Sequence, residues 1–352
     1  MDPLNRYETL DALRGVAALA VVMFHLGVVK LEPGVMPHGY LAVDFFFVLS
    51  GFVIAHAYGR ALTGGLGVGA FVRKRLVRLY PLAAAGVLVG LAVLLLKWRL
   101  FPDRVDSLPQ IAASGVLNLL MLPTPFGGPA SHHELFPGNG AMWSLFFELL
   151  VNLAWAAWLV RLRSRWLIAI VALSGAGVVY SDLAHETGCL GNTVETFPAG
   201  FARVFYGFTL GVLLHRHQNR LPASPLASGA PLLVAVTVVV VASPVRSIAW
   251  DVIGTLLVLP VIVAVGVGQR SPPRVARLLG DLSYPVYVLH FPILAITSGL
   301  RQSVLSQVNV HILSTAAVLA VLGASWVALK AYDEPVRRML SRVTPAPTRL
   351  AA

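Results

Sequence analysis

Two ionisable side chains, His25 and Glu148, lie within apolar segments that are long enough to cross a membrane. Ionisable groups in such segments are costly, so they face a protein interior or a water-filled cavity rather than lipid. A neutral imidazole can take a proton from an alcohol, and a carboxylate can orient that imidazole or stabilise its charged form. A buried base and a buried carboxylate are what proton transfer requires. We therefore predict that His25 and Glu148 are catalytic residues.

A third catalytic candidate, Arg14, precedes His25 by 11 positions in "LDALRGVAALAVVMFHLG". On an α-helix this spacing brings the two side chains to within about 20° of each other, separated by about 16 Å along the axis. Asp11 lies one turn before Arg14 and can pair with it near the membrane surface. The spacing therefore predicts that Arg14 and His25 project from one face of a helix.

Polar groups in other apolar segments fall at a similar depth. Asp44 lies near the start of "VDFFFVLSGF", Arg203 lies inside the segment 196–214, and "SYPVYVLHFP" carries two tyrosines and a histidine at spacings of three. Five segments thus each bring at least one ionisable group into one layer, which predicts an internal cavity. The residues predicted to bind substrate there are Asp44, Ser50, Trp143, Arg203, Tyr287 and His290.

Three of these six substrate-binding candidates also have a purely structural interpretation. His290 can bond the backbone of its own helix, Asp44 can serve only to neutralise Arg203 or His25, and Tyr287 can be a packing aromatic. The sequence leaves these alternatives open. His25 together with Glu148 is harder to explain by packing alone.

Basic residues are concentrated in "FVRKRLVRLYPL", which we predict to be a loop ahead of an apolar helix that begins at Pro81. Basic side chains beside a helix N-terminus form a phosphate site, and Arg75 and Arg78 share a helical face. The alternative is an anchor for anionic lipid. We predict that Arg73, Arg75 and Arg78 bind the phosphates of a cofactor or substrate.

The elements that must position these residues are membrane-spanning helices. Of the 352 residues, 57% are hydrophobic and 12% are charged, about half the charged share of a soluble domain. A spanning helix needs about 20 apolar residues. The sequence predicts an all-α integral membrane protein, a bundle of about ten transmembrane helices, with 107–122 as an outer or re-entrant helix. The spans are predicted at 10–29, 41–58, 80–97, 141–160, 165–181, 196–214, 228–243, 248–268, 282–299 and 309–329.

The distribution of basic residues predicts the orientation of this bundle. With the N-terminus inside, 19 of the 27 Lys and Arg residues fall in inner segments and 6 in outer segments. Such an excess of basic residues in the inner segments predicts that both termini are in the cytoplasm. It also explains the net charge of +11, so nucleic-acid binding is not needed to account for the basic composition. We predict one transmembrane domain over 1–335 and a short basic cytoplasmic tail over 336–352. The single cysteine, Cys189, gives no metal-site spacing, and we predict no metal.

Five segments in this order resemble the membrane-bound acyltransferase family 3, which O-acylates surface carbohydrates and some secondary metabolites. They are "LDALRGVAALAVVMFH", "VDFFFVLSGFVI", "FVRKRLVRLYP", "MWSLFFELL" and "LSYPVYVLHFP". Each is loose alone, but their order across most of the chain is specific. The resemblance implies an acyl-CoA donor, usually acetyl-CoA. The family's arginine–histidine motif falls on Arg14 and His25, its acidic residue on Glu148, and its basic pair on Arg75 and Arg78.

We accordingly predict an inner-membrane O-acyltransferase that uses acyl-CoA, with Arg73, Arg75 and Arg78 as the phosphate dock. The predicted acceptor is a hydroxyl of a carbohydrate or of a glycosylated or lipid-linked molecule. Membrane lipid is a further predicted partner, since it surrounds the bundle. His25 acts as base on that hydroxyl or on an acyl-relay group. The oligomeric state is left open. The alternative is a transporter or flippase that uses the buried charges as a pathway, although no inverted repeat is evident.

Overall fold

The computed structural model describes residues 7–32, 35–125, 133–220, 229–268 and 273–342. Within these ranges the chain is built from helices and contains no strand; Glu134 and Thr193 form an isolated bridge between two loops. The prediction of an all-α integral membrane protein is therefore confirmed.

Among the described residues, eight helices are long and apolar enough to cross a membrane, and two further apolar helices are shorter. Five of the long ones are single helices: Glu8–Val28 (α1), Val68–Leu100 (α3), Ser164–His185 (α6), Phe197–Arg216 (α7) and Arg274–Ser303 within α11 (Pro273–Ser303). The other three combine consecutive elements. Gly39–Thr63 comprises η2 (Gly39–Leu41) and α2 (Ala42–Thr63); Ile248–Gly266 comprises α9 (Ile248–Ile253), η7 (Gly254–Val258) and α10 (Leu259–Gly266); Val310–Arg342 comprises α12 (Val310–Val327), η8 (Ala328–Asp333) and α13 (Glu334–Arg342). The shorter ones are Met142–Ala157 (α5) and Leu233–Ala242 within α8 (Gly229–Ala242). Small helices occupy the connections: Pro102–Arg104 (η3), Leu108–Leu119 (α4), Leu159–Arg161 (η5) and Gln218–Arg220 (η6).

Each of the ten predicted spans overlaps one of these ten apolar helices. The predicted loop before the third span is wrong, because α3 already begins at Val68 and Pro81 lies inside it. A helix of 33 residues is about 50 Å long, whereas the hydrocarbon core is about 30 Å thick, so the basic turns can project beyond the lipid. Membrane helices tolerate an interior proline where neighbours pack against it. Pro81 is buried, and the Tyr332 hydroxyl donates to its carbonyl at 3.2 Å.

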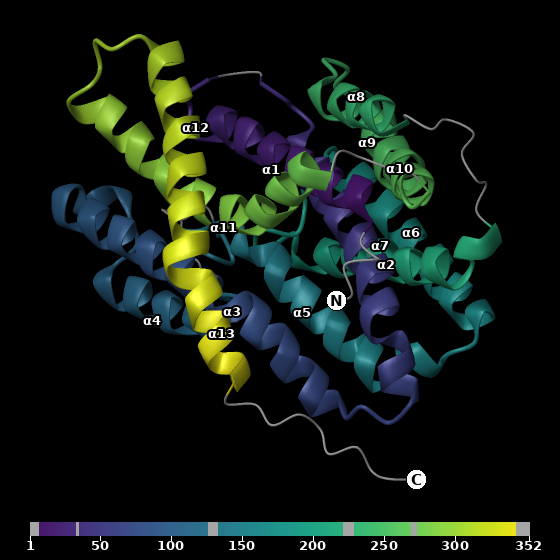
Figure 1. Cartoon of the computed structure of the whole chain (residues 1–352). Coiled ribbons are helices and arrows are strands. Elements are labelled where there is room, and N and C mark those ends of the chain that lie inside the picture. The colour runs from purple at the N-terminus through teal and green to yellow at the C-terminus, as the bar shows by residue number, and fades with distance from the viewer. Residues whose placement is uncertain (1–6, 33–34, 126–132, 221–228, 269–272, 343–352) are drawn as a thin grey trace.

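The helices pack around two close pairs, α1 with α11 and α2 with α7 (Figure 1). Glycines allow the second pair to approach. A Cβ atom on Gly51 would collide with the carbonyl oxygen of Phe208, and one on Gly211 would collide with that of Val48. Small residues at such contacts let membrane helices come close enough for van der Waals packing. This contact fixes the rotation of α2, which carries several of the site residues.

Because successive spans cross the membrane in opposite directions, the sequence predicts which connecting segments lie on the same side. Segments predicted to share a side are in contact in the structure. The Tyr7 hydroxyl at the start of α1 donates to Gln218 in η6 at 3.0 Å, and at the other end Arg301 donates to the carbonyl of Lys30 at 2.5 Å. Which end faces the cytoplasm stays a prediction. The predicted domain division at residue 335 falls within the continuous helix from α12 to α13 (Figure 1). The rest of the predicted tail, 343–352, lies outside the described residues.

Candidate active site

A cavity of about 160 Å³ lies in the middle of the bundle, between α1, α2, α3, α5 and α11. Its lining combines apolar side chains with charged and hydroxyl groups. This central cavity has as its polar lining Arg14, Ser50, Arg75, Arg78, Ser144, Glu148, Ser283, Tyr284 and Tyr287. Six of the predicted site residues are among them, brought together from five helices.

Glu148 is an ion-pair partner of Arg75 in the central cavity. Its Oε1 accepts from the Arg75 guanidinium at 2.7 Å and from the Ser50 hydroxyl at 3.0 Å. The sequence suggested that Glu148 orients or charge-balances His25. None of the described contacts of Glu148 reaches His25. The depth of the two residues could be read from the sequence, but the direction in which α5 points its carboxylate could not.

Arg14 is anchored to α11 beside the same cavity. It pairs with Asp11 at 3.2 Å, as its spacing predicts, and donates to the Ser283 hydroxyl at 2.9 Å and to the carbonyl of Gly280 at 2.6 Å. Its side chain is nevertheless 28% exposed, so part of the guanidinium faces the cavity. Ser283 is a lining residue that sequence reasoning missed, because a serine in an apolar helix carries no distinctive signal.

The three predicted phosphate-binding arginines are not equivalent. Arg75 and Arg78 line the central cavity, whereas Arg73 is exposed on the surface of α3 and does not. Arg78 lies over the ring of Tyr284 at 5.7 Å and 3.9 Å from the buried carboxylate of Asp333. The predicted shared face of Arg75 and Arg78 is confirmed, but they lie within a helix rather than beside its N-terminus.

His25 forms a pair with His290 next to the central cavity rather than in its lining. His290 Nε2 and His25 Nδ1 are 3.3 Å apart. His290 Nδ1 faces the carbonyls of Tyr287 at 2.8 Å and Val286 at 3.1 Å, so that nitrogen carries the hydrogen and Nε2 accepts. His25 Nδ1 also faces the carbonyl of Val21, at 2.8 Å. A carbonyl oxygen can only accept, so His25 Nδ1 carries the hydrogen and is the donor to both partners.

These hydrogen bonds assign the tautomer of His25. With the hydrogen on Nδ1, the lone pair of the neutral ring is on Nε2, which has no hydrogen-bond partner among the residues that the structure describes. Such a nitrogen can accept a proton. Tyr287 connects this pair to the cavity: its hydroxyl lies 2.6 Å from that of Ser144, and its ring centroid is 5.9 Å from that of His290.

Asp44 and Arg203 neutralise each other, as the structural interpretation of the sequence allowed. Arg203 donates to both carboxylate oxygens of Asp44, at 2.9 and 2.7 Å, and each side chain is 3% exposed. Arg203 also donates to the carbonyl of Leu190 and lies over the ring of Trp143 at 5.3 Å. Asp44, Arg203 and Trp143 are absent from the described lining of the central cavity, so their predicted role in substrate binding has no geometric support.

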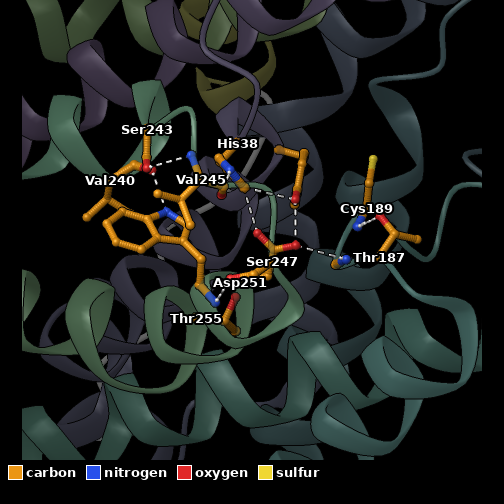
Figure 2. Close-up of polar contacts among 12 residues, drawn as sticks. His38, Thr187, Cys189, Val240, Ser243, Val245, Ser247, Asp251 and Thr255 are labelled. Carbon is orange, nitrogen blue, oxygen red and sulfur yellow. Dashed lines mark hydrogen bonds and ion pairs between the residues drawn. The ribbon is translucent and has the colours of Figure 1, made fainter.

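A second buried polar cluster was missed by the sequence analysis. Figure 2 shows His38 beside Asp251; the His38 Nδ1–Asp251 Oδ1 distance is 2.7 Å, and the Tyr40 hydroxyl donates to Oδ2 at 2.7 Å. The other His38 nitrogen lies 2.9 Å from the carbonyl of Val245. Both ring nitrogens of His38 thus have partners within the protein, which indicates a structural role for this cluster. Asp251 within an apolar segment was the available signal.

The fold and site together define a class: a multi-pass membrane protein with a charged internal cavity and a neighbouring histidine pair. In the described part of the chain, no group of three His, Cys, Asp or Glu side chains could hold a metal ion. No solved structure was found to match the chain.

A family model described as an acyltransferase domain matches residues 7–330. The chain belongs to this acyltransferase family, family 3 of the membrane-bound acyltransferases. It is 27% identical over 309 residues to a Komagataeibacter xylinus protein named as a membrane-bound transacylase, BcsY, covering 82% of this chain and 73% of that one. It is 27% identical to the Rhizobium meliloti exopolysaccharide production protein ExoZ, covering 72% and 75% of the chains. It is 25% identical to a Bacillus subtilis protein named as a peptidoglycan O-acetyltransferase, YrhL, covering 83% of this chain and 49% of that one. Family membership favours the enzyme over the transporter alternative.

Proposed function

We propose that this protein is an inner-membrane O-acyltransferase that moves an acetyl or other acyl group from acyl-CoA to a hydroxyl of a carbohydrate or a glycosylated or lipid-linked acceptor. Family membership supports the acyl transfer. The relatives named as an exopolysaccharide production protein and a peptidoglycan O-acetyltransferase support O-acylation of a saccharide. Acyl-CoA is a substrate in this proposal, and no metal takes part.

The charge of the central cavity is the observation that carries the proposal. Three guanidinium groups, those of Arg14, Arg75 and Arg78, line it together with one carboxylate, that of Glu148. Among the lining side chains guanidinium groups outnumber carboxylates, while Asp11 and Asp333 approach Arg14 and Arg78 from outside the lining. Arginine binds phosphates through charge-assisted hydrogen bonds, so this lining suits a ligand with several phosphates. Arg73, exposed on the same helix, extends the positive surface beyond the cavity. The apolar residues of the lining suit the thioester end of the donor; at about 160 Å³ the cavity holds only part of acetyl-CoA.

His25 supplies the base in this scheme. Its free Nε2 takes the proton of the acceptor hydroxyl, whose oxygen attacks the thioester carbonyl carbon. The C–S bond then breaks, and the proton goes to the CoA thiolate. His290 accepts from His25 Nδ1 and keeps Nε2 unprotonated before the reaction. Tyr287 lies between the cavity and this pair, so the thioester reaches the base along Tyr287.

The donor site is tested by isothermal titration of the purified protein with acetyl-CoA and with 3′-dephospho-acetyl-CoA. We expect acetyl-CoA to bind more tightly, and Arg78→Gln to weaken its binding about tenfold through the loss of one charge-assisted hydrogen bond. Arg165→Gln, which removes an exposed cation far from the cavity lining, is the matched control. Failure of acetyl-CoA to bind would contradict the donor assignment.

The acceptor is tested by mass spectrometry of glycans from intact cells with and without the gene. We expect an O-acyl mass increment to disappear on deletion and to return with the wild-type chain but not with His25→Ala. A positioned base contributes about 10²- to 10⁴-fold in rate. A purified His25→Ala protein that transfers acetyl groups at the wild-type rate would overturn the catalytic assignment.

A further inference from the structure

A second cavity of about 510 Å³ lies where α2 and α7 end, at the end of the bundle predicted to face the cytoplasm. Its lining includes His56 and Arg60 from α2 and His215 and Arg216 from α7. None of the described residues that line it is acidic. Ser50, six residues before His56 on α2, lines the central cavity, so different positions along α2 line the two cavities. This second cavity, the α2–α7 cavity, plays no part in the acyl transfer proposed above.

Arg216 and the two histidines of the α2–α7 cavity are held in place by neighbouring groups. The Arg216 guanidinium donates to the carbonyls of Leu162 at 2.6 Å and Val160 at 2.9 Å. The rings of His56 and His215 pack edge to face, with centroids 5.6 Å apart. The ring nitrogens of the two histidines have no hydrogen-bond partner within the described ranges, and Arg60 has no acidic partner there.

Two further lining residues, Gln218 and Trp155, contribute hydrogen-bond donors. The side-chain oxygen of Gln218 already accepts from the Tyr7 hydroxyl at 3.0 Å. Trp155 is 1% exposed, and its indole N–H has no acceptor among the described residues. The C-terminal ends of α2 and α7 contribute about half a negative charge each, which offsets only part of the charge of Arg60 and Arg216. The cavity is therefore suited to a ligand that brings several anionic oxygens.

We propose that the α2–α7 cavity binds a phosphate-bearing ligand, independently of the donor site in the central cavity. Arginine and histidine donors that lack a protein carboxylate are the partners that phosphate oxygens use. The volume is within the range of pockets that hold small organic ligands, so it accommodates a phosphate together with part of the group that carries it. Two sources share this chemistry, a phospholipid headgroup and a soluble phosphoester.

The test measures binding of inorganic pyrophosphate to the detergent-purified full chain by isothermal titration calorimetry. A parallel arm compares the Tm of the protein in phosphatidylcholine nanodiscs with and without phosphatidic acid. We expect Arg60→Gln to weaken the response about tenfold, because one charge-assisted hydrogen bond is lost, and His56→Asn with His215→Asn to weaken it further. Arg60 is exposed, so its variant is expected to fold. Arg165→Gln, another exposed cation, is the control and should bind like the wild type.

The outcomes separate the two ligand sources and the two sites. Pyrophosphate binding that falls in Arg60→Gln supports a soluble phosphoester, and a response to phosphatidic acid alone, lost in the same variant, supports a headgroup. No response in either arm, or a response that Arg78→Gln abolishes and Arg60→Gln leaves intact, overturns the proposal. Acetyl-CoA titrated into the same variants reports separately on the proposed acyltransferase, which Arg60→Gln should leave unchanged.

Discussion

At the scale of single residues, the direction of a hydrogen bond decides which histidine is the base. His290 accepts from His25 because its own Nδ1 is committed to backbone carbonyls. His290 therefore acts through His25 and positions it. Both residues were predicted from the sequence as site residues, His25 as catalytic and His290 as substrate-binding, but their contact joins positions 265 residues apart and only the structure shows it.

This arrangement makes a prediction about His290. In His290→Leu one of the two acceptors for His25 Nδ1 is lost and only the Val21 carbonyl remains. We expect the acetyl transfer rate to fall about fivefold, because one hydrogen bond contributes about 1 kcal/mol. His290→Gln, whose amide oxygen can accept, should keep most of the rate. Single-turnover kinetics measure the rate, while titration with acetyl-CoA should show unchanged binding. Equal losses for both variants would contradict the positioning role.

A second residue-scale prediction concerns the Asp44–Arg203 pair. Arg203→Met leaves a buried carboxylate without its partner, which costs about 3–5 kcal/mol and lowers the Tm and the yield of folded protein. The double variant Asp44→Leu with Arg203→Met removes both charges and should recover part of that loss. Size-exclusion chromatography and thermal unfolding measure the effect. An Arg203→Met protein with wild-type Tm and a raised KM for the acceptor would restore the substrate-binding interpretation.

At the scale of elements, the close contact between α2 and α7 holds Ser50 and the wall of the α2–α7 cavity in position. We expect Gly211→Leu to push the helices apart, because its side chain would overlap the backbone of Val48, and to lower the folded yield severely. Gly323→Leu is the matched control, since a Cβ on Gly323 meets nothing within 4 Å. Detergent solubility and Tm distinguish the two variants. Equal behaviour would show that this contact does not fix α2.

At the scale of the whole molecule, the predicted orientation is open to a labelling test. Burial raises the pKa of the native Cys189 thiol to about 11, so it reacts slowly and gives a quiet background. The distribution of basic residues predicts that Arg165→Cys reacts with a membrane-impermeant maleimide only in opened cells. Gln307→Cys, exposed in the connection after α11, should react in intact cells. The reverse labelling pattern would show that the bundle has the opposite orientation in the membrane, with the proposed donor site on the outer side.

The sequence by itself determined the features that are local. Apolar length predicts the helices, since each buries its backbone hydrogen bonds within itself. Spacing predicts the Asp11–Arg14 pair and the shared face of Arg75 and Arg78. The basic helical turns ahead of Pro81 escaped this reasoning, because a proline is also the usual first residue of a helix.

Only the tertiary structure decided which polar groups meet. A residue's depth in the membrane follows from its position along a helix, but the rotation of each helix about its axis follows from packing against distant segments. That rotation turns Glu148 toward Arg75 rather than His25, joins Asp44 to Arg203, and gathers the guanidinium groups around one cavity. The chemistry was present in the list of residues; the packing of the helices selected the partners.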